Sequence, residues 1–139
     1  MATNYEAFYT NLGYLLYSVA ANDGQVRPEE RAALGKLIKE QWLPLESSRD
    51  AMGTDKGHYI DIGFDFANDE GMETDEAFRR FGEHLRAQTA MYDVGMRRMI
   101  MQTAVAIADS VAGRNKSELT RLTQLRMLFG EVPVPDQAG

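Results

Sequence analysis

The chain has no cysteine among its 139 residues and only four prolines and one tryptophan. The lack of cysteine excludes disulfide bonds, thiolate metal sites and thiol catalysis. Basic residues are outnumbered by acidic ones, giving a formal net charge of -6. No basic stripe interleaved with aromatic residues offsets the repulsion that this charge creates toward nucleic-acid phosphates or an anionic membrane surface. We therefore expect neither nucleic acid nor a membrane surface as a partner.

Long apolar runs are also missing. No segment approaches the roughly 18–20 apolar residues that cross a bilayer, and the first residues lack the features of a signal peptide. We expect a cytoplasmic protein that does not insert into a membrane. The 44% hydrophobic and 26% charged residues are typical of a globular protein large enough for one core. The sequence predicts one domain over residues 1–131 and a flexible tail over residues 132–139.

Apolar residues recur at three- and four-residue steps along most of the chain, which is the spacing of one helix face. This periodicity predicts helices over about residues 4–22, 28–43, 74–85, 93–112 and 115–129. Pro44 is expected to end the second of these helices, Thr74 to cap the next and Gly130 to close the last. The chain between residues 47 and 57 has the glycines and aspartates of a loop.

Residues 58–68 are ambiguous. Their apolar residues alternate as in a strand, yet Ile60, Phe64 and Ala67 also share one helix face. Because an isolated strand is unstable and no partner strand is evident, we predict a short helix. The predicted fold is therefore an all-α bundle of six to seven helices.

Two parts of the sequence resemble each other. Residues 19–24 (VAANDG) match residues 105–110 (VAIADS) at an offset of 86, and beyond the turn an offset of 88 pairs Glu30 with Glu118. Each copy has a helix, an acidic turn and a second helix with an acidic start. This pattern predicts an internal duplication of helical hairpins related by a pseudo-twofold axis.

Residues 22–30 (NDGQVRPEE) are the most distinctive segment. They match the second half of an EF-hand loop, with Asp23 as a ligand and Glu30 as the closing glutamate, but Val19 and Ala21 offer no side-chain oxygen in the first half. One such turn supplies fewer oxygens than the six to eight that calcium takes. Two turns together would supply the carboxylates of Asp23, Glu29, Glu30, Asp109 and Glu118.

The same residues also have a purely structural interpretation. Asp and Gly are common in turns, and carboxylates in the first turn of a helix favour its positive end. Glu30 lies three residues after Arg27, where its side chain can accept a backbone N–H in a capping box. The spacing alone leaves both helix caps and a cation site open.

Residues 17–30 (YSVAANDGQVRPEE) resemble the TerB-like tellurite-resistance family in their Ala-rich helix end, Asp-Gly turn and Pro-Glu-Glu helix start. The resemblance covers roughly residues 8–129, with a degenerate second copy near the C terminus. It implies a bundle of about seven helices with internal duplication, a role in tellurite resistance or wider stress responses, and metal binding at the acidic turns.

Carried onto this chain, the resemblance implies one site at Asp23 with Glu29 or Glu30 and another at Asp109 with Glu118. The second copy departs from the family pattern, because a serine replaces the glycine and two residues are inserted. These departures put a shared two-turn site in doubt.

Few other residues suggest a catalytic or ligand-binding site. His58 and His84 lie in no ligand-spaced motif, and the sequence has neither a nucleophile turn nor a glycine-rich phosphate loop. Methionines gather late in the chain, where they fill the core or line a partner groove; they are Met91, Met96, Met99, Met101 and Met127. Four tyrosines fall on the first helix and are not all expected to be buried; they are Tyr5, Tyr9, Tyr14 and Tyr17.

Together these features predict a non-enzymatic, stress-response helical module. In the first hypothesis its paired acidic turns bind a divalent cation, and oxygen ligands favour calcium or magnesium over zinc. In the alternative hypothesis the turns are only helix caps, and the chain is a protein–protein interaction or dimerisation module. Its expected partners are other proteins of a stress-response complex or a second copy of the chain.

Overall fold

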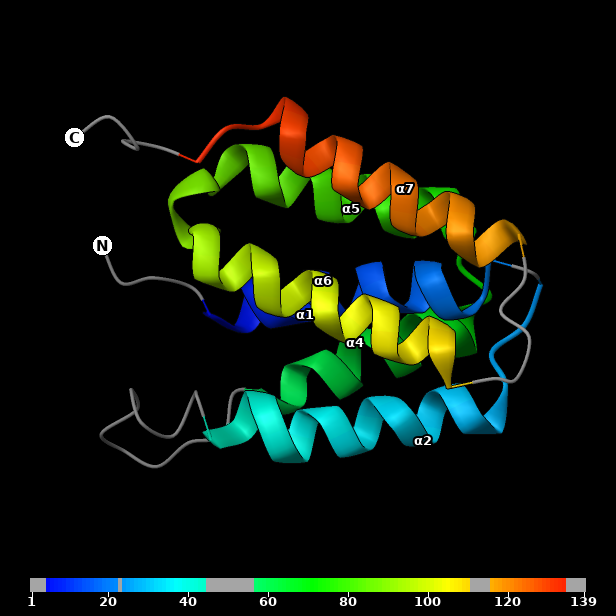
Figure 1. The fold of residues 1–139 in the computed structure, drawn as a ribbon. Helices are drawn as coiled ribbons and strands as arrows, with labels where there is room; N and C mark the ends of the chain where they lie inside the picture. Colours follow the sequence, from blue (N-terminus) through cyan, green and yellow to red (C-terminus); the bar gives the residue numbers. More distant parts are fainter. Residues whose placement is uncertain (1–4, 23, 45–56, 111–115, 135–139) are drawn as a thin grey trace.

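The computed structural model describes residues 5–22, 24–44, 57–110 and 116–134, with the backbone alone for residues 116–118. Within these ranges the chain forms six α-helices, a π-helical segment and a 3-10 turn, and it contains no strand. The elements in chain order are α1 (Tyr5–Ala20), α2 (Pro28–Leu37), η1 (Ile38–Trp42), α4 (His58–Glu70), α5 (Thr74–Ala87), η2 (Thr89–Met91), α6 (Val94–Asp109) and α7 (Lys116–Glu131). The predicted all-α bundle is confirmed (Figure 1).

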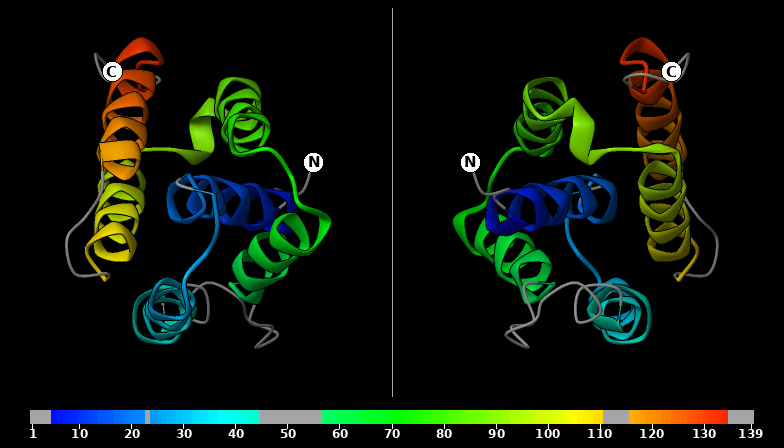
Figure 2. Two further views of the ribbon diagram at one scale, coloured as in Figure 1. Left: turned by 90° about the vertical axis from the view of Figure 1, so that its right-hand side faces the viewer. Right: turned by 90° about the vertical axis from the view of Figure 1, so that its left-hand side faces the viewer.

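Helix α1 lies at the centre of the bundle. Viewed along the helices, it is surrounded by α4 and α5 on one side and by α6 and α7 on the other, with α2 below (Figure 2). The apolar residues that recur at three- and four-residue steps along it are fully buried; they are Phe8, Leu12, Leu15, Leu16, Val19 and Ala20. Tyr9 and Tyr17 are buried as well, whereas Tyr5 and Tyr14 are half-buried. The first helix therefore offers less tyrosine surface than expected, because neighbouring helices cover it on several faces.

Helices α1 and α4 cross at close range. A Cβ atom added to Gly13 would lie 2.7 Å from the backbone nitrogen of Phe64 and closer still to the carbonyl oxygen of Ile60. A Cβ atom added to Gly63 would overlap the backbone of Thr10 in the same way. Two glycines therefore let the two helix backbones touch where they cross.

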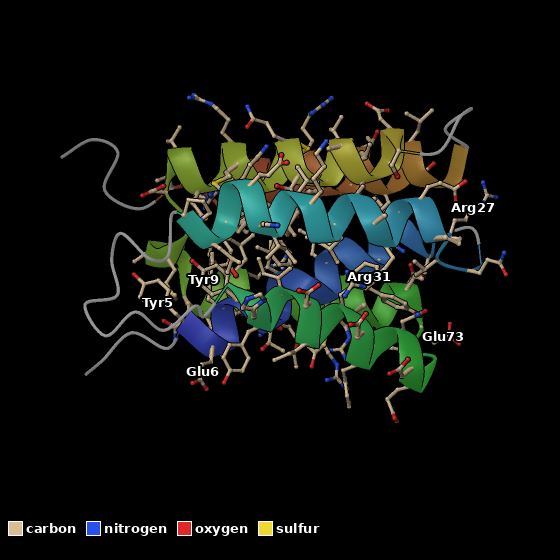
Figure 3. The ribbon with its side chains drawn as sticks, turned by 90° about the horizontal axis from the view of Figure 1, so that it is seen from below. Tyr5, Glu6, Tyr9, Arg27, Arg31 and Glu73 are labelled. Atoms are coloured by element: carbon tan, nitrogen blue, oxygen red, sulfur yellow. The ribbon has the colours of Figure 1, made fainter. Side chains whose placement is uncertain are left out.

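Helix α4 also confirms the helix predicted for residues 58–68. Its C-terminal end is joined to α1 by Tyr17, whose hydroxyl donates a hydrogen bond of 2.7 Å to the carbonyl of Met72. Arg31 of α2, labelled in Figure 3, pairs with two carboxylates of α4, Asp61 at 2.8 Å and Asp65 at 2.9 Å. Its hydrogen bond to Asp65 is the main reason why the pKa of Arg31 is raised.

The second helix is described as far as Pro44, the residue predicted to end it, and residues 45–56 lie outside the described part of the chain. Residues 38–42 widen into a π-helix, in which the N–H of Leu43 donates to the carbonyl of Ile38, and both Leu43 and Pro44 remain helical. Proline has no N–H and its ring crowds the carbonyl four residues earlier, so a wider turn before it accommodates the ring. Trp42 on this segment donates a hydrogen bond of 3.0 Å from Nε1 to Oγ1 of Thr103, which ties η1 to α6.

The start of α5 and the end of α7 differ from the predictions. Thr74 is the first residue of α5 rather than its cap, and Gly130 lies inside α7. Asp93 caps α6, where its carboxylate accepts a hydrogen bond of 2.8 Å from the N–H of Met96. Leu119 has the spacing of the buried face of α7, three residues before Leu122, yet it is 44% exposed. Residues 47–56 of the predicted loop, the end of one predicted helix and the start of the next within residues 111–115, and residues 135–139 of the predicted tail lie outside the described residues.

The internal duplication is not confirmed. Helices α6 and α7 pack along each other as a hairpin, but α2 packs mainly on α6 and its own π-helical extension rather than on α1. The start of α7 does agree with the proposed repeat, because α7 begins at Lys116, 88 residues after Pro28, where α2 begins. None of the helices in the described ranges is long and apolar enough to span a bilayer.

The crossing of α1 and α4 generates a stability prediction. Gly13→Ala and Gly63→Ala should each lower the free energy of unfolding by about 1–3 kcal/mol or more, because the added methyl group forces the backbones apart. Gly130→Ala is the matched control, since a Cβ atom there has no neighbour within 4 Å. It should be neutral or stabilising by less than about 1 kcal/mol. Urea denaturation measures all three, and equal effects would contradict a close crossing.

Candidate functional site

Both predicted acidic connections are at the same end of the molecule. The end of α1, the start of α2, the end of α6 and the start of α7 all lie there (Figure 1). Asp23 itself lies outside the described residues, and Gly24 next to it has a φ of 117°, which favours glycine as predicted for a turn. The fold therefore places the two connections on one side, without fixing the position of every predicted ligand.

Glu30 is part of the start of α2. Its side chain is only 2% exposed, and its Oε1 accepts a hydrogen bond of 2.9 Å from the backbone N–H of Arg27. Arg27 has the extended backbone of an N-cap residue, and Pro28 occupies the first helical position. This is the glutamate half of a capping box, and the carboxylate also lies at the positive end of the helix dipole. Glu30 thus has a structural role that requires no bound cation.

The other predicted ligands lie near helix ends. Glu29 is exposed on the first turn of α2, and Asp109 is exposed as the last residue of α6. Glu118 lies on α7, and its side chain is outside the described part of the structure. Among the side chains that the structure describes, no three acidic or histidine groups are arranged to hold a metal ion.

A buried arginine that the sequence interpretation missed occupies this end of the bundle. The Arg121 side chain is 3% exposed, and its Nη2 donates to Oδ1 of Asn22 at 2.8 Å and to Oδ1 of Asp75 at 2.7 Å. Nη1 donates to Oε1 of Gln124 at 3.0 Å, and the guanidinium carbon lies 4.9 Å from the ring centre of Phe78. Arg121 therefore connects α7 to the turn after α1 and to the start of α5.

This arginine also sets the electrostatics beside the acidic turn. A guanidinium held at Asn22, the residue before Asp23, supplies positive charge beside the turn to which the first hypothesis assigns a divalent cation, and like charges that lie close together repel each other. Its burial is tolerated because hydrogen bonds and the carboxylate of Asp75 offset the loss of water. The described geometry thus favours a capping role for the acidic residues, beside the buried guanidinium of Arg121, over a metal centre.

A signal for Arg121 was present in the sequence. It precedes Leu125 by four residues and Leu128 by seven, which is the spacing of the buried face of α7. A charged residue on a buried face is unusual and indicates a specific set of partners. Those partners are 99 residues away at Asn22 and 46 away at Asp75, so spacing along one helix could not identify them.

The histidines and methionines take mainly structural positions. Burial lowers the pKa of His84 and raises that of Tyr92, and a hydrogen bond of 2.8 Å joins Nδ1 of His84 to the Tyr92 hydroxyl. His58 is exposed, 3.7 Å from Asp61. Met96 is buried, whereas Met127 is 59% exposed. The remaining three methionines of the group are half-buried against the core; they are Met91, Met99 and Met101.

Comparisons of the chain with protein-family models, with curated proteins and with solved structures found no match. The function is therefore argued from the geometry of the described residues. The resemblance of residues 17–30 to the TerB-like family stays a prediction.

The capping role of Glu30 generates a prediction. Glu30→Gln keeps an acceptor oxygen for the N–H of Arg27 and should cost less than about 1 kcal/mol of unfolding free energy, whereas Glu30→Ala leaves that donor unpaired and should cost about 1–2 kcal/mol. The exposed neighbour provides the control, since Glu29→Ala should stay within about 0.5 kcal/mol of the parent protein. Chemical denaturation measures all three variants. A glutamine as harmful as the alanine would show that the charge, and not the hydrogen bond, is required.

Proposed function

We propose that this chain is a non-enzymatic helical module that acts by binding another protein, with its acidic turn serving as part of the fold. The observation that carries the proposal is an exposed apolar face on α4, where Ile62 is 54% and Phe66 is 49% exposed. Single exposed apolar residues are common on proteins, but two large ones four residues apart share one helix face. Such contiguous apolar surface is a feature of binding sites.

A second helix carries a smaller apolar face. Leu119 and Met127 of α7 are 44% and 59% exposed, and the side chains of Thr120 and Thr123 lie beside them around a shallow hollow. Neither helix needs these residues for the core, which is filled by other side chains of α4 and α7. The TerB-like resemblance adds a stress-response setting to the proposal, with partners drawn from a stress-response complex or a second copy of the chain.

Site-specific crosslinking tests this proposal. A photoreactive amino acid placed at Ile62 or Met127 should give a discrete crosslinked product in the cells that make the protein, because these positions lie on apolar faces. The control is Gln102, which is exposed on α6 outside both faces and should give no product. Sedimentation of the purified chain then shows whether the product is a second copy. Absence of products from both apolar faces would overturn the proposed function.

The second candidate function is divalent cation binding by the paired turns. It is favoured by one observation, which is that the helix ends flanking both acidic connections lie at the same end of the molecule (Figure 1). A hard cation with oxygen ligands, calcium or magnesium, would suit the carboxylates there. The capping role of Glu30 and the presence of Arg121 weigh against it.

Thermal unfolding with added cations separates the two candidates. A ligand at about a hundred times its dissociation constant stabilises a protein by about 2.7 kcal/mol, which raises the Tm of a domain of this size by several degrees. If the turns are only caps, millimolar calcium, magnesium, manganese or zinc should leave the Tm unchanged. A rise that disappears in Asp23→Ala, but persists in the control Asp69→Ala, would establish the cation site.

A further inference from the structure

The exposed face of α4 lies beside a groove that Tyr59 of the same helix lines. Tyr59, Ile62 and Phe66 lie at positions i, i+3 and i+7 of the helix and therefore on one side of it. The ring of Phe66 lies 6.5 Å from the ring of Tyr14 on α1. Tyr14 and Tyr59 both line an open groove of about 780 Å³ between α1, α4 and α5. These four side chains form what we call the aromatic ridge.

The C-terminal end of α4 carries uncompensated negative charge beside the ridge. Asp61, Asp65 and Asp69 follow one another at four-residue steps, a spacing at which like charges repel. Arg31 pairs with the first two, but within the described residues neither Asp69 nor Glu70 has an ion-pair partner. Both are exposed in the last turn of α4, where the helix dipole disfavours carboxylates. Asp69 and Glu70 therefore do not stabilise α4, so the stability of this helix does not explain their presence.

Acidic groups also flank the other end of the groove. Glu6, exposed at the start of α1, lies at the opposite end of the molecule from Glu73, which follows α4 (Figure 3). The two arginines of the groove do not reverse this charge, because Arg79 and Arg80 donate to the carboxylate of Glu76 at 2.6 Å and 2.8 Å. The groove therefore borders the aromatic ridge through Tyr14 and Tyr59, and acidic groups lie near both of its ends.

The charge argues against a second copy as the occupant. In a twofold dimer the same patch meets itself, so the carboxylates of both chains, Asp69 and Glu70 among them, would gather at one interface. The whole chain also has a net charge of -6, so two copies repel each other at long range. The surface is complementary instead to an apolar segment that carries positive charge.

We propose that the aromatic ridge and its groove bind one amphipathic α-helix of a different protein. The apolar side of that helix packs on Ile62 and Phe66, and its lysines and arginines face Asp69, Glu70 and Glu6. A helix laid in a groove contacts it through residues at i, i+3 or i+4 and i+7, which is the spacing of the ridge itself. This inference rests on the proposed function and names both the surface and the chemistry of the partner.

Binding of labelled peptides tests the inference. Three peptides of about 18 residues, or about five helical turns, are measured by fluorescence anisotropy. One is an amphipathic leucine–lysine helix, the second has glutamate in place of every lysine, and the third has the composition of the first in an order without an apolar face. Only the first should bind, and its affinity should fall as salt screens the charges.

Matched variants locate the binding surface. The double variant I62S/F66S should weaken binding of the basic peptide by about tenfold or more, and D69N/E70Q by about threefold or more, since hydrophobic anchors and unscreened charges both contribute. The control L119S/M127S removes equally exposed apolar residues from α7 and should change the affinity less than twofold. All the substituted side chains are exposed, and circular dichroism confirms that each variant is folded.

Several outcomes would overturn the inference. They are absence of binding by the basic peptide, equal binding by the acidic or rearranged peptide, and equal losses in the α4 and α7 variants. The crosslinking experiment separates this failure from failure of the proposed function. Products from Met127 without any from Ile62 would support the proposed interaction module and contradict the binding surface on α4. Absence of products from both positions would contradict both the proposed function and this inference.

Discussion

The guanidinium of Arg121 joins three parts of the chain that are distant in sequence: the turn after α1, the start of α5 and the middle of α7. A buried charge is tolerated only where hydrogen bonds and opposite charge replace water, so these segments must meet around it. Because α1 is the central helix, the position of its last residues also sets the path to α2. The acidic end of the bundle is thus a junction held from within, to which Glu30 contributes by fixing the first turn of α2.

This junction changes the meaning of the acidic turn. Its described polar groups serve the fold: Asn22 accepts from Arg121, and Glu30 accepts from the backbone of Arg27. The charges that serve no evident structural purpose lie elsewhere, at the C-terminal end of α4 and next to exposed Ile62 and Phe66. Natural sequences depart from the rules of local stability mainly at functional sites. We therefore place the interaction surface on α4 and not at the acidic turn.

Helical periodicity was sufficient to predict the fold class, most helices and the buried stripe of α1, because it depends only on residues close in sequence. Periodicity alone left residues 58–68 ambiguous, and the lack of a partner strand then identified the helix correctly. Helical periodicity failed where contacts between distant parts of the chain determine which side chains are buried. Tyr9 and Tyr17 are buried because several helices surround α1, and Leu119 is exposed because nothing described covers that side of α7. The partners of Arg121 and the crossing of α1 and α4 depend on segments far apart in the chain, and the similarity of the two acidic turns did not predict how α2 packs.

A double-mutant cycle between Asn22 and Arg121 tests the structural junction most directly. The unfolding free energies of the parent, Asn22→Ala, Arg121→Met and the double variant give the coupling between the two side chains apart from their separate contributions. A hydrogen bond to a charged donor at a buried site predicts a coupling of about 1–3 kcal/mol, unchanged by millimolar calcium. A coupling below about 0.3 kcal/mol, or one that appears only with calcium, would contradict the account.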